Sequence, residues 1–211
     1  MLVLGTVATV GLVGVRILAT ASADSANLVW NLVLAWVPFV LALVVYDGFR
    51  RGVSRGPLLV GAGLWLLFLP NAPYLLTDFK YLREWQGVPG WYDVLLLAVA
   101  SGTGLALGFV SLYLVHAIAR RILRPAGSSV FVVAVLGLTS LGVYIGRFER
   151  WNSWDVFAQP ASLLSDVAGW LSDPLEHGRA VVLMGLFTAF LTLAYGLFCR
   201  LLELGPAPER D

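Results

Sequence analysis

The sequence predicts an all-α fold, a polytopic bundle of about six membrane-spanning helices, and three observations support this. Of the 211 residues, 59% are apolar and only 13% are charged, whereas a soluble domain has about 45–50% apolar and about 25% charged residues. Apolar runs long enough to cross a bilayer recur along the chain, and its mean hydropathy is +0.83. The eight Trp and seven Tyr fit the same class, because amphipathic rings favour the headgroup level.

Composition also excludes several kinds of function. A net charge of +1 gives no basic face for nucleic acid. Cys199 is the single cysteine, so neither an intrachain disulfide nor a thiolate metal cluster can form. Two histidines, His116 and His177, leave haem or zinc ligation poorly supplied. We therefore expect no cofactor and no metal site.

The first two spans are predicted at residues 2–20 and 28–46. Arg16 interrupts the first near its end, and residues 21–23 read Ala-Ser-Ala, which resembles a signal-peptidase site. A signal peptide carries its positive charge before the apolar run, whereas here the charge follows, so a retained helix is favoured and cleavage is the alternative. The second span carries Asn31 one turn inside its start.

The third span is predicted at residues 57–76 and ends in the sequence Pro70-Asn71-Ala72-Pro73. Two prolines so close together predict a kink or break in the helix. A break at membrane depth is tolerated only where protein or a watery cavity covers it. Thr77 and Asp78 then predict the cap of a short interfacial helix that runs to Trp85.

The remaining spans are predicted at residues 94–119, 129–146 and 180–202. Small residues at 102–108 indicate close helix packing in the fourth span, because no Lys-Ser/Thr ending makes them a phosphate loop. An amphipathic pattern at 160–171 predicts a second interfacial helix. The chain thus reads as one transmembrane domain, 1–204, with a short cytoplasmic tail, 205–211.

Basic residues predict the orientation in the membrane. The loops after the second and fourth spans, with the tail, carry eight of them, and the opposite loops carry five. Because positive residues stay on the cytoplasmic side, both termini are predicted to be cytoplasmic. The first group is Arg50, Arg51, Arg55, Arg120, Arg121, Arg124, Arg200 and Arg210; the second is Lys80, Arg83, Arg147, Arg150 and Arg179.

Four separated segments bring polar side chains to one level near the outer side. Asn31 enters the membrane there, Asn71 lies at the break, Asp78 follows it, and Arg147 leaves the fifth span. Arg16 is a fifth candidate. Ionisable groups at such a depth cost free energy unless they are paired or face a polar cavity. We therefore predict an outward-facing polar pocket, roofed by Trp85, Trp91, Trp151 and Trp154.

The segment YIGRFERWNSWD at residues 144–155 carries most of this chemistry. Helical spacing would place Arg147, Arg150, Trp151 and Trp154 on one face, where two guanidinium groups suit a carboxylate or phosphate. The competing interpretation is structural, with Arg147 paired to Asp78 and Arg150 to Asp155. The predicted ligand-binding residues are Asn31, Asn71, Asp78, Arg147, Arg150, Trp151, Asn152 and Trp154.

Catalysis has weaker support. Asp78, Glu149 and Asp155 are the acid or base candidates, but sequence cannot place a pair of them across a substrate. Ser101 and His116 are 15 residues apart, about 22 Å along one helix, which excludes a nucleophile and its base. Ser101 is predicted to be a packing residue, and His116 a cation that complements the cytoplasmic helix end.

Three segments carry a family resemblance: LVWNLVLAWVPF at 28–39, LFLPNAPYLLTDF at 67–79 and LGVYIGRFERWNSWD at 141–155. They resemble the signature blocks of a bacterial multi-pass membrane family, domain of unknown function 1361. The resemblance implies an integral membrane protein without an assigned activity. The residues that it singles out are Asn31, Asn71, Pro73, Asp78, Gly146, Arg147, Arg150, Trp151, Asn152, Trp154 and Asp155.

The leading functional hypothesis is a non-enzymatic protein that binds or passes a small anionic or amphiphilic ligand. An enzyme acting on a lipid-linked substrate at the outer face, and an assembly or scaffold protein, are the alternatives. Expected partners are the lipid bilayer, an anionic or lipid-linked small ligand, and a second copy or another membrane subunit.

Overall fold

A computed structural model describes residues 1–149, 151, 153, 155–159, 161–162, 165 and 178–203. Within these ranges the regular structure is helical, without strands, which confirms the all-α prediction. Six helical segments of the described chain are long and apolar enough to cross a membrane. They are Leu2–Thr20, Ala26–Arg50, Arg55–Arg83, Gly90–Ile122, Pro125–Glu149 and Gly178–Glu203.

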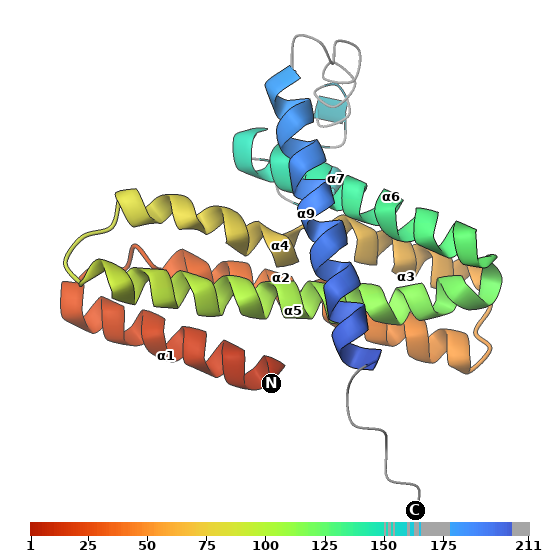
Figure 1. The fold of residues 1–211 in the computed structure, drawn as a ribbon, viewed down its shortest axis with the longest axis horizontal. Helices are drawn as coiled ribbons and strands as arrows, with labels where there is room; N and C mark the ends of the chain where they lie inside the picture. The colour runs from red at the N-terminus through yellow and green to blue at the C-terminus, as the bar shows by residue number, and fades with distance from the viewer. Residues whose placement is uncertain are drawn as a thin grey trace, which may run out of the picture.

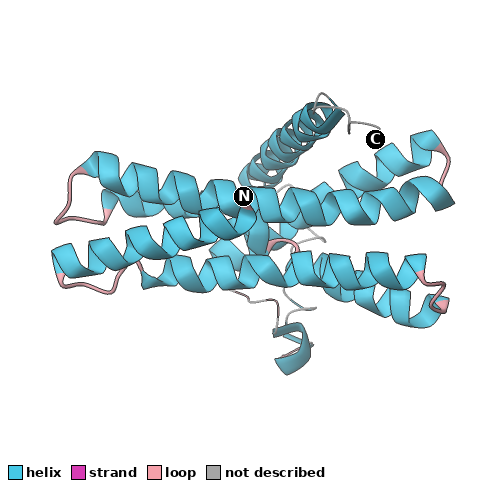
Figure 2. Ribbon diagram, turned by 90° about the horizontal axis from the view of Figure 1, so that it is seen from below, coloured by secondary structure: helices cyan, strands magenta, loops and turns pink. Residues whose placement is uncertain are grey.

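From α1 to α6, short loops at the two ends of the bundle join the long helices (Figures 1 and 2). Figure 1 shows α9 crossing the direction in which α2, α3 and α5 run. The elements are α1 (Leu2–Thr20), α2 (Ala26–Arg50), α3 (Arg55–Phe68), α4 (Asn71–Tyr74), the 3₁₀ helix η1 (Leu75–Arg83), α5 (Gly90–Ile122), α6 (Pro125–Tyr144), the π-helix η2 (Ile145–Glu149), α7 (Asp155–Ala158) and α9 (Gly178–Glu203).

The predicted break in the third span is present. α3 ends at Phe68 and α4 begins at Asn71, directly after Pro70. The close packing predicted for the small residues of the fourth span is also present. A Cβ atom at Gly104 would lie 2.6 Å from the carbonyl oxygen of Ala72, so α4 lies directly against α5.

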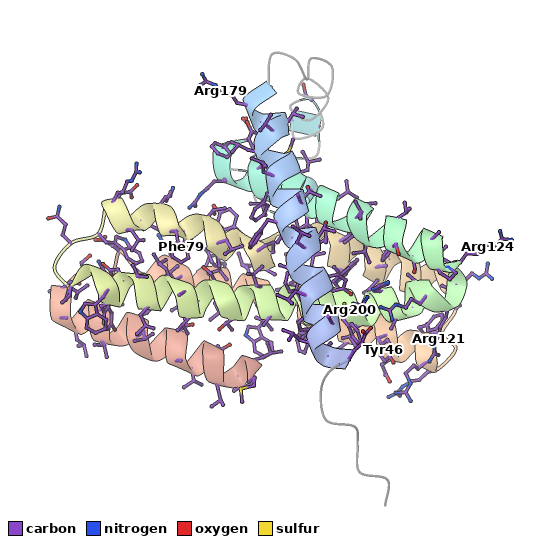
Figure 3. All side chains as sticks on the ribbon, in the orientation of Figure 1. Tyr46, Phe79, Arg121, Arg124, Arg179 and Arg200 are labelled. Carbon is purple, nitrogen blue, oxygen red and sulfur yellow. The ribbon has the colours of Figure 1, made fainter. Side chains whose placement is uncertain are left out.

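A short helix follows this break, as predicted, but the predicted cap is wrong. The chain continues from α4 as η1 and packs along α5, with Phe79 directed into the core (Figure 3). Asp78 caps no helix, because it lies inside η1 and is fully buried. The hydroxyl of Thr77 donates to the carbonyl of Tyr74 instead. Tertiary packing of its apolar residues keeps η1 against the bundle. The second predicted interfacial segment, 160–171, lies mostly outside the described residues.

Two apolar clusters form the core. One joins α1, α2, η1 and the first half of α5, and it includes Leu28, Leu75 and Leu97. The other joins α3, α5, α6 and α9 around Trp65, whose indole donates to Ser111 Oγ at 3.2 Å. The break at α4 lies between them, so the polar residues that follow it are enclosed by helices.

Candidate functional site

The carboxylate of Asp78 is the centre of a polar network that joins three segments. Asn31 of α2 donates to Asp78 Oδ2 at 2.9 Å, and Arg147 of η2 donates to Asp78 Oδ1 at 3.2 Å. Asp78 is fully buried and the Arg147 side chain is only 10% exposed. Asn31, Asp78 and Arg147 therefore converge, as predicted. Arg147 and Asp78 also form the ion pair that the structural interpretation expects.

Four further contacts hold the Arg147 guanidinium. Nη1 donates to the Tyr74 hydroxyl at 3.2 Å, and Nη2 also donates to the carbonyl of Thr77. The guanidinium carbon lies 5.1 Å from the ring centre of Tyr74 and 5.7 Å from that of Tyr81, within cation–π range. A π-helix at the end of α6 places Arg147 here, and such π turns occur often at functional sites.

The network lies well inside the length of the bundle. Ser101 Oγ donates to the carbonyl of Leu75 at 2.9 Å, which fixes the start of η1 beside residue 101. Residue 101 is about 16 Å along α5, whose 33 residues extend about 50 Å. Asp78 follows Leu75 three residues later in the 3₁₀ helix, about 6 Å nearer the start of α5, so it lies close to the edge of an apolar layer about 30 Å thick centred on α5. Because Asp78 is fully buried, its charge would be costly without a partner, and pairing with Arg147 offsets that cost. Ser101 packs helices together, as predicted.

A first cavity, of about 220 Å³, has both predicted asparagines in its wall. We call it the amide cavity. Asn71 Nδ2 donates to the carbonyl of Phe68 at 2.9 Å and to Ser153 Oγ at 3.0 Å. Arg147 does not line this cavity, although its neighbour Gly146 does. The lining residues are Trp30, Asn31, Leu34, Leu67, Pro70, Asn71, Tyr74, Gly142, Ile145, Gly146, Trp151, Ser153 and Val156.

A second cavity, of about 470 Å³, lies between η1, the end of α6 with η2, and α9. We call it the α6–α9 groove. Its walls are mostly apolar, with Arg147 and Lys80 contributing the two cationic groups. The lining residues are Thr77, Lys80, Ser140, Val143, Tyr144, Arg147, Phe148, Leu183, Met184 and Phe187. The sequence analysis did not select Lys80, although it stands two residues after Asp78.

Arg16 does not join the network, so that prediction is wrong. Its Nε lies 2.8 Å from Asp93 Oδ1, with the two side chains 1% and 4% exposed. The guanidinium also lies 4.3 Å from the Trp85 ring centre. Asp93, in the first turn of α5, is the closer carboxylate. Asp93 directly precedes the predicted fourth span, 94–119, on the same side of the membrane as Arg16, and this position was the signal that could have identified it as a partner.

The other predicted site residues that the structure describes are dispersed. Of the four tryptophans expected to roof the pocket, Trp151 lines the amide cavity, Trp85 contacts Arg16, and Trp91 is 67% exposed. Arg150, Asn152 and Trp154 lie outside the described residues. Glu149 is exposed at the end of η2, and Asp155 is half-buried at the start of α7.

His116 is not a helix-end cation, contrary to the prediction. It is buried within α5, where Arg120 Nε donates to its Nε2 at 3.2 Å and its Nδ1 lies 3.0 Å from the Tyr195 hydroxyl. Because arginine has only donors, Nε2 must accept, so the proton is on Nδ1 and the ring is neutral. His116 therefore links α5 to α9. Among the described residues, no three His, Cys, Asp or Glu side chains gather to hold a metal ion.

A family model described as "Protein of unknown function (DUF1361)" matches residues 30–194, well over half of the chain. The chain belongs to the DUF1361 family. The match includes Asn31, the broken third span and the whole of η2, so the polar network of this DUF1361 protein lies inside the family region. No significant match was found among curated proteins or solved structures.

Proposed function

We propose that this DUF1361 protein binds a small anionic amphiphile, with its apolar part in the α6–α9 groove and its charged group at Lys80. One observation carries the proposal: an apolar groove between helices has cationic side chains in its wall. Pockets that bind amphiphiles combine an extensive apolar lining with a few placed polar groups. Leu183, Met184 and Phe187 of α9 supply the apolar side.

Of the two cations in the groove wall, Lys80 is the one whose charge can attract an anionic ligand. Arg147 is already paired with Asp78, so the two together contribute no net charge. Lys80 is exposed and forms no ion pair within the described part of the chain, where its ammonium lies 4.9 Å from the Tyr81 ring centre. An anionic group at the groove would therefore be attracted to Lys80, and Arg147 has further N–H groups to donate to it.

The proposal extends to location and direction. The protein would lie in a bacterial plasma membrane with both termini in the cytoplasm, as its basic residues indicate, and the Asp78 network would be nearer the outer side. Passage of the ligand is part of the same proposal, since broken helices with polar residues at the break are common at transport sites. Asp78 is fully buried and accepts hydrogen bonds on both oxygens, which argues against its use as a general acid or base.

Lipid binding by the purified protein tests the proposal. The protein is placed in phosphatidylcholine nanodiscs, and increasing amounts of phosphatidic acid are added while bound lipid is counted by native mass spectrometry. We expect preference for phosphatidic acid, and Lys80→Gln should reduce that preference about fivefold, the effect of about 1 kcal/mol per cation.

The matched control is Arg83→Gln, which removes an exposed cation from the same 3₁₀ helix but not from the groove wall. It should leave the preference unchanged. Equal losses in the two variants, or no preference for the anionic lipid in the unaltered protein, would contradict the proposal.

A further inference from the structure

We infer that the amide cavity binds a neutral polyhydroxylated group, either the headgroup of a lipid or a free polyol. The inference deepens the proposed function, and rests on it for the lipid source, because it adds the headgroup chemistry to the anionic amphiphile. It is based on the hydrogen-bonding capacity that remains in the cavity wall.

The two asparagines of the cavity wall each have a side-chain oxygen, Oδ1, that can accept a hydrogen bond from a ligand. Asn31 Nδ2 faces the carboxylate of Asp78, and Asn71 Nδ2 faces the carbonyl of Phe68. Both partners can only accept, so the orientation of each amide is fixed and each Oδ1 points away from them. Within the described residues, neither Oδ1 receives a hydrogen bond. The cavity therefore offers two hydrogen-bond acceptors to a ligand that donates hydrogen bonds. Each acceptor is oriented by the bond that the Nδ2 of the same amide donates.

The wall also offers a donor. The Tyr74 hydroxyl accepts from Arg147, so its own proton is available for a second partner. Asn31 uses one of its two Nδ2 protons on Asp78, which leaves another. A hydroxyl group both donates and accepts, so several hydroxyl groups would suit this mixed set better than a pure donor would.

Aromatic rings complete the wall. Trp30, Tyr74 and Trp151 all line the cavity. Rings of this kind give an apolar surface with a polar edge, which matches a sugar or cyclitol with its C–H faces and hydroxyl rim. Trp30 is 57% exposed, so it borders the opening and not the base of the cavity.

Charged headgroups fit less well. Among the residues that the structure describes, no Asp or Glu lines the cavity, so these residues give a bound ammonium no counter-charge. Arg147 does not line the cavity either, so the described wall gives a phosphate no cation. Burial of an unpaired charge is costly, so a neutral group is favoured. Because Gly146 lines the amide cavity and Arg147 lines the α6–α9 groove, the two sites share the wall formed by η2.

The test compares phosphatidylinositol with phosphatidic acid in the same nanodiscs, prepared without glycoside detergents, whose sugar headgroups would compete. The two lipids share the phosphate and differ in the polyol. Phosphatidylinositol should bind about 30-fold more tightly, the factor that corresponds to two neutral hydrogen bonds of about 1 kcal/mol each. Trp30→Leu should reduce that ratio about fivefold through loss of the ring surface.

Trp91→Leu is the control, because Trp91 is also exposed, 67% against 57% for Trp30, and lines neither the amide cavity nor the groove. It should leave the ratio unchanged, and neither variant should alter the preference for phosphatidic acid over phosphatidylcholine. Free inositol that binds with the same sensitivity to Trp30→Leu would support the hydroxyl chemistry and assign it to a free polyol.

The failures are distinguishable. Equal binding of phosphatidylinositol and phosphatidic acid, both above phosphatidylcholine, would overturn this inference and leave the proposed function standing. Tighter binding of phosphatidylethanolamine than of phosphatidylinositol would also overturn it, in favour of an ammonium site. Loss of all preference over phosphatidylcholine would remove the proposed function itself.

Discussion

The buried pair of Asp78 and Arg147 gives the sharpest prediction about stability. Asp78→Ala leaves the guanidinium of Arg147 in a nearly dry site, 10% exposed, with only neutral partners. Loss of one member of a buried pair costs about 3–5 kcal/mol. Because Tyr74 and Thr77 still accept from Arg147, we expect the lower end, about 3 kcal/mol less free energy of unfolding.

A second substitution separates the charge from the contacts. Arg147→Met added to Asp78→Ala removes the uncompensated cation, so the double variant should be about 2 kcal/mol more stable than the sum of the single effects. Asp47→Ala is the control, since Asp47 pairs with Arg51 at 2.8 Å but the side chains are 57% and 75% exposed. That pair should contribute at most about 1 kcal/mol.

Reversible unfolding in mixed detergent micelles measures these free energies. The reasoning is refuted when the two single effects add to within about 0.5 kcal/mol, because residues that do not interact behave in this way. A loss for Asp47→Ala as large as that for Asp78→Ala would refute it as well, since burial would then make no difference.

Two further predictions concern orientation and packing. Reporter fusions after Arg83 and after Arg124 should give an outer and a cytoplasmic signal respectively, and the reverse pattern would reject the outward-facing pocket. Gly104→Ala should destabilise the protein by about 1–3 kcal/mol in the same unfolding assay, because the new Cβ would lie 2.6 Å from the Ala72 carbonyl oxygen. Gly102→Ala, with open space around the glycine, should cost nothing measurable.

The number of spans and the break in the third span could be predicted from the sequence because both depend on local chemistry. Apolar length determines a span, and the pair Pro70 and Pro73 determines the break. The pairing of Asp78 with Arg147 followed from the cost of burying either alone. These arguments require no knowledge of which helices are neighbours.

The wrong predictions concern residues whose partners depend on which helices pack against each other. Arg16 pairs with Asp93 because α1 packs on α5, an arrangement that charge counting does not reveal. His116 is buried because α9 brings Tyr195 against it. Asp78 was expected to cap the helix that follows the break, yet it lies inside η1, whose apolar side chains pack on α5.

The polar residues near the break in the third span form hydrogen bonds with the backbone, and these bonds do not depend on a ligand. Between α3 and α4 the carbonyls of Leu67 and Phe68 lack their usual helical partners, and at membrane depth each of these must be satisfied by protein. Ser153 donates to Leu67 and Asn71 donates to Phe68. Within η1, side chains add bonds to carbonyls of the 3₁₀ helix: Thr77 to Tyr74, Ser101 to Leu75 and Arg147 to Thr77.

Because some of these side chains also support the backbone, only certain substitutions can report on ligand binding. Replacing Asn71 would leave the Phe68 carbonyl unsatisfied, and replacing Arg147 would leave the Asp78 carboxylate unpaired. Either change also alters a cavity wall, so lost binding would not be separable from lost stability. Lys80 and Trp30 line the cavities without donating to the backbone of the described chain, and both are exposed. A ligand-specific effect should therefore appear at Lys80 and Trp30 with the melting temperature unchanged, whereas a purely structural network predicts that neither substitution matters.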